Sequence, residues 1–154
     1  MGIFNMLNQK NGFAVALILV FAIASVVLTR PQSAPAVSGV SGLMTLKTMA
    51  QTATPYEVAM ANQKPTLIEF YADWCTTCQA LSPTINALHE QWGDRINFVM
   101  LNIDDPQWAN QVERFQVNGV PNLTLLDEAQ AVTDTFIGNT PKSLIENELA
   151  ELLT

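Results

Sequence analysis

Residues 69–79 read EFYADWCTTCQ, and this stretch decides the fold. It joins a run of β-forming residues, TLIEFY over residues 66–71, to a Cys-Thr-Thr-Cys sequence that begins at Cys75. Apolar side chains then recur at helical spacing as far as Trp92. The pattern predicts a central strand that leads directly into a helix, with Cys75 in the first turn of that helix.

The position of this cysteine has a chemical consequence. Near the start of a helix, unpaired backbone N–H groups and the positive end of the helix dipole stabilise an anion. The thiolate is the form that attacks a disulfide, and this setting lowers a cysteine pKa from about 8.5 to roughly 3.5–7.5. Cys75 is therefore the expected nucleophile. Cys78, one turn later, can attack the mixed disulfide between Cys75 and a substrate.

Two other uses of the cysteine pair are disfavoured by the rest of the sequence. The chain has 2 cysteines in total, and a disulfide that closes so short a loop constrains little of the unfolded chain. A zinc site would need further Cys or His ligands, whereas His89 is the only histidine and is expected on a helix surface. We expect a redox pair, no bound metal and no cofactor beyond the cysteines themselves.

The remaining pattern predicts an α/β domain with one mixed sheet covered by helices on both faces. The expected strands span residues 66–71, 96–103, 122–126 and 132–137, the last two forming a hairpin. The expected helices span residues 55–62, 75–92, 106–115 and 141–153. Residues 43–50 are apolar enough for a first strand or a packing segment, and their spacing does not decide between the two.

The N-terminal part of the chain carries a membrane signal. Between Lys10 and Arg30 lie 19 uncharged residues, which as a helix at about 1.5 Å per residue nearly match the roughly 30 Å hydrocarbon core. The alternative is a cleaved secretory signal ending near residues 34–36, but the apolar run is longer than such signals use. Either interpretation exports the remainder of the chain.

These signals divide the chain into four expected parts. They are an N-terminal tail over residues 1–10, a transmembrane helix over 11–30, a linker and lead-in segment over 31–54, and a folded domain over 55–154. Residues 56–154 contain all 14 acidic residues and only four of the basic ones. So acidic a domain argues against a nucleic-acid partner, because phosphates require clusters of Lys and Arg.

Several motifs together resemble the active-site region of thioredoxins. They are EFYADWCTTCQ, Pro83 after the second cysteine, and the sequence Gly119-Val120-Pro121. The resemblance implies a thioredoxin fold over residues 55–154 and a cis peptide bond before Pro121. It also implies a substrate groove in which Val120 offers its backbone to an extended polypeptide. The residues expected to border this groove are Trp74, Val120, Pro121 and Gly138.

Glu69 occupies the position where thioredoxins carry a buried carboxylate behind the cysteines. The resemblance therefore implies that Glu69 exchanges a proton with Cys78. From the residues alone, Glu69 could instead point to solvent from an edge strand. Two departures matter: Met100 replaces a lysine of thioredoxins, and Thr76-Thr77 replaces their Gly-Pro. Since the intervening dipeptide tunes a redox potential that spans about −270 to −120 mV among relatives, the motif leaves the direction of electron flow open.

The expected anchor, combined with EFYADWC, VMLNIDDPQW and SLIENEL, is similar to the TxlA-type thioredoxin-like proteins of cyanobacteria and chloroplasts. That resemblance implies a single-pass protein of the thylakoid or plasma membrane whose domain faces the lumen or periplasm. It further implies a disulfide reductase that receives electrons from a transmembrane donor and acts on protein clients such as apocytochromes during cytochrome assembly. The alternatives are a disulfide oxidase or isomerase on the same fold, and a binding or assembly module in which the cysteines are secondary.

Overall fold

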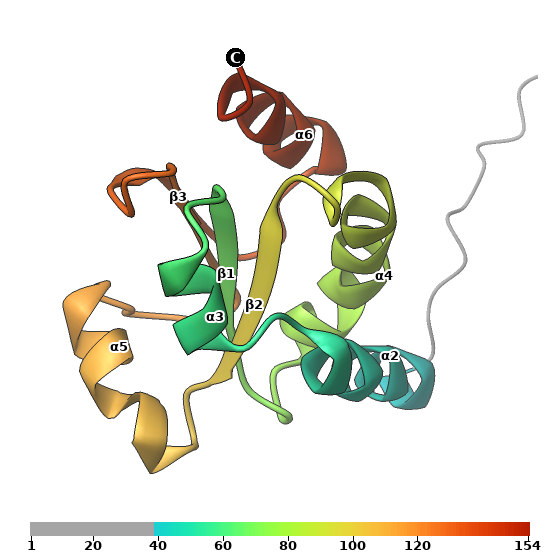
Figure 1. Ribbon diagram of the computed structural model, residues 1–154. Helices are drawn as coiled ribbons and strands as arrows, with labels where there is room; N and C mark the ends of the chain where they lie inside the picture. Colours follow the sequence, from blue (N-terminus) through green and yellow to red (C-terminus); the bar gives the residue numbers. More distant parts are fainter. Residues whose placement is uncertain (1–38) are drawn as a thin grey trace, which may run out of the picture. The chain divides into compact units, whose positions relative to one another are not determined.

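A four-stranded sheet organises residues 39–154, the part of the chain that the computed structural model describes (Figure 1). The strands are β1 (Thr66–Tyr71), β2 (Asn97–Asn102), β3 (Asn122–Leu126) and β4 (Val132–Ile137), in the spatial order β2-β1-β3-β4. β1 pairs parallel with β2 and antiparallel with β3, and β3 pairs antiparallel with β4. The predicted mixed sheet is confirmed, and each predicted strand agrees with the observed one to within a residue at either end.

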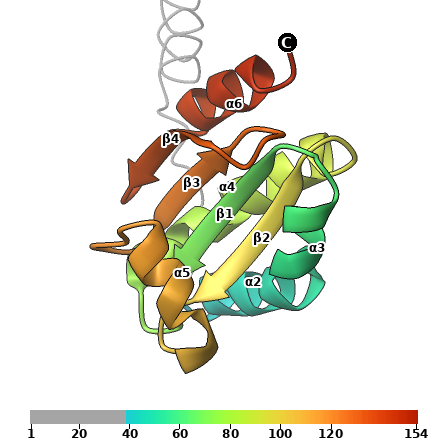
Figure 2. The same ribbon diagram turned by 60° about the vertical axis from the view of Figure 1, so that its left-hand side comes forward.

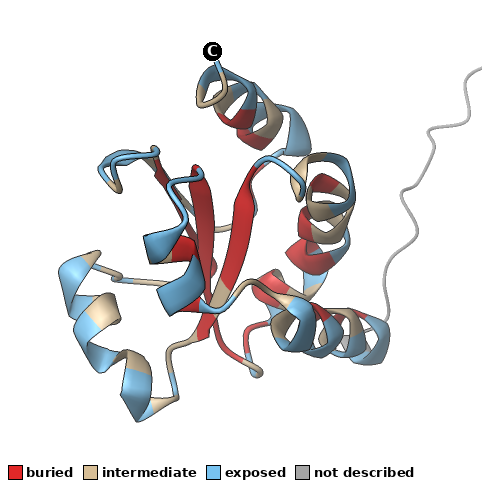
Figure 3. Cartoon of the chain, viewed as in Figure 1, coloured by how far each residue is buried: buried red, intermediate tan, exposed pale blue. Residues whose placement is uncertain are grey.

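Burial follows the position of each strand in the sheet. Every residue of β1 and β3 is buried, as expected for central strands that are covered on both faces (Figure 3). β4 lies at an edge, and its residues are exposed or half-buried. The cysteine motif follows directly on β1, so the reactive segment starts from one of the two most enclosed strands of the sheet.

Helices cover both faces of the sheet (Figure 2). One face packs against α2 (Gly39–Thr52), α4 (Thr76–Trp92) and α6 (Lys142–Glu151), and the other packs against α3 (Tyr56–Ala61) and α5 (Ala109–Arg114). The 3₁₀ turn η1 (Pro106–Trp108) precedes α5, so the helix predicted over residues 106–115 is divided into two short pieces.

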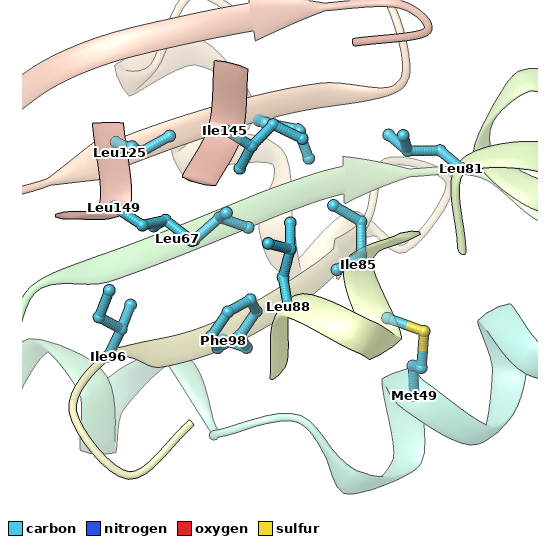
Figure 4. Packing of buried hydrophobic residues seen from close by; sticks show 11 residues of the cluster. Met49, Leu67, Leu81, Ile85, Leu88, Ile96, Phe98, Leu125, Ile145 and Leu149 are labelled. Carbon is cyan, nitrogen blue, oxygen red and sulfur yellow. The ribbon is translucent and has the colours of Figure 1, made fainter. Parts of the chain in front are cut away.

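The larger core lies between the sheet and the α4 side. Figure 4 shows aliphatic side chains of β1, α4 and α6 meeting around Leu67, together with Met49 from α2. Burying a side chain of this kind contributes roughly 1.5–3 kcal/mol relative to leaving it exposed. The opposite core is aromatic as well as aliphatic, with Tyr56 and Trp108 in edge-on contact at 5.9 Å between ring centroids.

Residues 43–50 are helical, so the interpretation of this segment as a strand is wrong and its interpretation as a packing segment is right. The buried positions Gly42, Leu46 and Met49 recur at the i, i+4, i+7 spacing of one helix face. The whole of α2 also lies inside residues 31–54, where the sequence predicted a linker and lead-in. The folded part therefore begins before residue 55, because α2 packs on α4.

The predicted transmembrane helix over residues 11–30 lies outside the described residues. Among residues 39–154, no helix is both long enough and apolar enough to cross a membrane.

Candidate active site

The turn from β1 into α4 holds both cysteines. The backbone N–H of Cys75 donates to the carbonyl of Ala72 at 3.1 Å, which closes the turn. Cys75 is the N-cap of α4, and its Sγ accepts a hydrogen bond from the backbone N–H of Cys78 at 3.0 Å. The cysteine thus lies at the start of the helix, as the sequence predicts. The same N–H group can stabilise a thiolate on Cys75 after reduction.

The two cysteines are joined by a disulfide, with their Cα atoms 5.3 Å apart. They differ in access to solvent, since Cys75 keeps 5% of its surface exposed and Cys78 keeps none. An incoming thiol or disulfide therefore meets Cys75 first. The helix geometry and the burial both distinguish Cys75 as the outer sulfur of the pair.

A small apolar cluster encloses the disulfide. Tyr71 and Ala72 come from the end of β1, and Leu46 comes from α2, where it is fully buried. Burial raises the pKa of the Tyr71 hydroxyl, and the negative charges of Asp73, Glu69 and Asp105 raise it further, in that order. The cluster keeps one side of the sulfur pair dry.

The loop before β3 brings Val120 and Pro121 to the cysteines. The Val120–Pro121 peptide bond is cis, as the resemblance implied. Val120 packs against the cluster that contains Cys75 and Cys78, while Pro121 is buried. The N–H of Gly138, at the end of β4, donates to the carbonyl of Pro121 at 2.9 Å. Three of the four predicted groove residues are thereby brought together.

Trp74, the fourth predicted groove residue, directly precedes Cys75 in the chain. Its side chain is 65% exposed, and its indole N–H donates to the Oδ2 atom of Asp104 at 2.8 Å. Asp104 follows β2 and had not been singled out from the sequence. No local pattern could have revealed it, because the contact joins positions 30 residues apart.

Glu69 lies in the middle of β1 and is fully buried. Glu69 pairs with Met100 of β2 on one side and with Leu123 of β3 on the other. β1 is therefore a central strand, which excludes the alternative of an exposed edge strand. Neither carboxylate oxygen has a hydrogen-bond partner among residues 39–154. Burial penalises the charged form and raises the pKa of Glu69 to about 8. This carboxyl can therefore change its protonation state close to neutral pH.

A cavity of about 10 Å³ adjoins Glu69, which is about the volume that one water needs. Met100 of β2 lines it together with Met49 of α2 and His89 of α4. The ring of His89 stacks on Phe98 at 4.9 Å between centroids. With Met100 in the cavity wall, burial dominates the pKa of Glu69.

Metal binding finds no support in the described part of the chain. Residues 39–154 contain no group of three Cys, His, Asp or Glu side chains that could hold an ion.

Comparison with known proteins agrees with this geometry. The thioredoxin family model matches residues 22–151. The thiol:disulfide interchange protein TxlA of Synechococcus elongatus is 40% identical over 144 residues, covering 94% of this chain and 71% of that protein. The chloroplastic thioredoxin-like protein HCF164 of Oryza sativa is 42% identical over 110 residues, covering 71% of this chain and 42% of that protein. The chain thus spans less than half of the second relative.

Solved structures agree on the fold. A germline-specific thioredoxin, Deadhead, from Drosophila melanogaster superimposes with a TM-score of 0.55 at 22% identity, covering 62% of this chain and 88% of that one. A thioredoxin variant from Halobacterium salinarum gives a TM-score of 0.55 at 24% identity, covering 62% and 80%. With the family match and the TxlA relative, these likenesses lead to one conclusion: the chain belongs to the thioredoxin family and is a thiol–disulfide oxidoreductase.

Proposed function

We propose that this oxidoreductase is a membrane-anchored disulfide reductase whose domain faces the lumen or periplasm and acts on protein clients. The observation that carries the proposal is the Cys75–Cys78 disulfide at the start of α4, backed by the buried carboxyl of Glu69. The names of two relatives support it, since one is a thiol:disulfide interchange protein and the other is chloroplastic.

The first chemical step belongs to Cys75. In the reduced protein its thiolate attacks one sulfur of a client disulfide, forms a new S–S bond to that sulfur, and displaces the other client sulfur as a thiolate. The backbone N–H of Cys78, 3.0 Å from Cys75 Sγ, stabilises the attacking anion. The displaced client thiolate takes up a proton.

The second step belongs to Cys78, with Glu69 as its proton acceptor. The Cys78 thiol gives its proton to the Glu69 carboxylate, and the resulting thiolate attacks Cys75 Sγ. The bond between Cys75 and the client breaks, and the second client sulfur leaves as a thiolate. The client has gained two electrons, and the Cys75–Cys78 disulfide has formed.

A groove beside Cys75 would hold the client chain. Val120 would offer its backbone next to the cysteines, and Gly138 fixes the position of this loop through its hydrogen bond to the carbonyl of Pro121. Trp74, next to Cys75 in the chain, would add an exposed aromatic surface. The client would bind in extended form, as an added strand.

Regeneration needs an electron donor. The apolar run over residues 11–30 would anchor the chain in a thylakoid or plasma membrane, beside a transmembrane donor that returns the pair to its dithiol form. Apocytochromes, whose paired cysteines must be reduced before haem attachment, are the proposed clients. The reductase would thereby serve cytochrome assembly.

The redox potential tests the direction of electron flow. The Cys75–Cys78 pair of the full chain is equilibrated with glutathione buffers of known ratio. A potential near the thioredoxin value of about −270 mV is expected, whereas one near the oxidase value of about −120 mV would favour the disulfide oxidase or isomerase.

Genetic rescue separates the enzyme from a binding module. In a strain lacking the gene, the variant carrying both Cys75→Ser and Cys78→Ser should fail to restore cytochrome content. Full restoration would overturn the reductase proposal.

Protease digestion tests the proposed orientation. The domain should be protected from protease added on the cytoplasmic side of sealed vesicles, and its digestion from that side would overturn the orientation.

A further inference from the structure

Helix α2 has one packed face, and that face meets the redox site. Gly42, Leu46 and Met49 are buried along it, whereas Val40 and Met44 on other sides of the helix are 77% and 62% exposed. The packed face therefore buries three residues within two turns, and the proposed function assigns none of them a role.

Leu46 holds the helix against the cysteines. It is fully buried in a cluster whose other buried members, Tyr71, Ala72, Cys75 and Cys78, all belong to the cysteine segment. Removing a buried leucine of this kind is strongly destabilising, so the contact fixes the position of α2 firmly.

Two further contacts fix the distance between α2 and α4. A Cβ atom on Gly42 would lie 2.6 Å from the carbonyl oxygen of Gln79, so the backbones approach more closely than any larger residue allows. Ser82 Oγ donates to the carbonyl of Gly42 at 3.1 Å. An exposed ion pair of 3.0 Å between Lys47 and Asp73 adds a weaker link to the cysteine turn.

Met49 is one turn beyond Leu46 and reaches the surroundings of Glu69. It is 5% exposed, and it lines the cavity beside Glu69 together with Ile85 and His89 of α4. Figure 4 shows its side chain extending from α2 toward Ile85. The thioether therefore occupies space through which solvent would otherwise reach the carboxyl.

We propose that Met49 is a positioning residue of the redox site, which closes the Glu69 cavity from the α2 side and limits it to about one water. Leu46 and Gly42 keep α2 where Met49 can do so. The proposal rests on the proposed role of Glu69 as the proton acceptor for Cys78. It adds that the proton affinity of Glu69 is set by a helix outside the cysteine segment.

Other titratable groups also face Glu69. Tyr71 lies two residues along β1, and His89 of α4 lines the same cavity. The cysteines lie at the start of α4, and Lys47 of α2 is paired with Asp73. β2 and β3 contain no titratable side chain. Any test must therefore follow Glu69 directly and observe His89 at the same time.

The test is the titration of the Glu69 carboxyl carbon by NMR, on the oxidised full chain in detergent, with Glu69→Gln used to assign the signal. Met49→Ala enlarges the cavity and admits more water, so the pKa of Glu69 should fall by about 1 unit toward its ordinary value. Met49→Leu keeps the cavity wall apolar and should preserve the original titration. Met44→Ala, on the exposed side of the same helix, should leave it unchanged.

An unchanged Glu69 titration in folded Met49→Ala overturns the proposal, as does an equal shift in Met44→Ala or a shift confined to His89. If Met49→Ala does not fold, Met49→Gln takes its place, because it keeps the length of the side chain and brings an amide to the carboxyl. An unchanged Glu69 titration in Met49→Gln would also overturn the proposal. Because this measurement involves no client and no electron flow, it can succeed even where the reductase proposal fails.

Discussion

Glu69 is the residue whose protonation should govern the rate of exchange. Because burial raises its pKa to about 8, the carboxyl is mostly protonated below that pH and cannot accept the proton of Cys78. The attack of Cys78 should therefore accelerate as the pH rises through about 8. In Glu69→Gln this inflection should disappear, with a loss of roughly 10²-fold in rate above it. Stopped-flow measurement of client reduction gives these rates, and Glu128→Gln, at an exposed position, is the control. An inflection that persists in Glu69→Gln would belong to a cysteine instead.

The same carboxyl should make the stability of the oxidised protein depend on pH. Above the ordinary Glu value of 4.5 the unfolded chain releases the Glu69 proton, whereas the folded protein retains it up to about 8. The free energy of unfolding should therefore be highest below pH 4.5. It should fall by about 1.4 kcal/mol per pH unit as the pH rises from 4.5 to about 8, and this contribution is lost above the folded pKa.

Urea unfolding of wild type and Glu69→Gln across this range measures the effect. The glutamine side chain does not titrate, so the difference between the two proteins should grow steadily in favour of the variant as the pH rises. A constant difference would mean that Glu69 titrates alike in the folded and unfolded states.

At the scale of elements, most of the sheet could be predicted from sequence. β1 and β3 are short apolar runs bounded by turn residues, and the hairpin of β3 and β4 has a clear turn between its strands. α2 could not be assigned, because residues 43–50 are apolar at too many positions to favour one period. Leu46 and Met49 are spaced as on one helix face, but Gly42, the third residue of that face, lies outside the run, and two positions do not distinguish a helix from a strand.

The packing of α2 on α4 predicts that Gly42→Ala is costly. The added methyl group would lie 2.6 Å from a backbone oxygen of Gln79, so one helix must shift. Overpacking of this kind typically costs 1–3 kcal/mol. At Gly119 the nearest atom to an added Cβ is 3.8 Å away, an ordinary contact, so Gly119→Ala serves as the control. Denaturant unfolding should show a lower midpoint for Gly42→Ala only.

β4 offers a matched pair of variants for client binding. Ile137 and Val132 are exposed by 61% and 54% at opposite ends of this strand. Ile137 adjoins Gly138, whose N–H holds the Pro121 loop, so it lies at the proposed groove. Ile137→Ala should raise KM for a protein client several-fold, and Val132→Ala should leave KM unchanged. Equal effects in the two variants would mean that clients bind elsewhere.

At the scale of the molecule, the redox domain should depend on residues that precede position 55. A fragment covering residues 39–154 retains α2 and should fold, with Leu46 in place over the cysteines. A fragment covering 55–154 lacks α2 and exposes the apolar residues that Leu46 and Met49 cover. Its unfolding midpoint should therefore be markedly lower. Circular dichroism during thermal unfolding would compare them. Equal midpoints would show that α2 contributes nothing to the domain.

The carboxyl that has no partner among the described residues also supplies a label. A protonated carboxyl with no donor nearby has its C=O stretching vibration at high frequency, and hydrogen bonding to water lowers that frequency. Glu69 is fully buried, and its neutral form persists to about pH 8. Infrared difference spectra between the oxidised and reduced protein should therefore show a band from this one side chain, whose frequency reports how wet the interior behind the sulfurs becomes during each redox cycle.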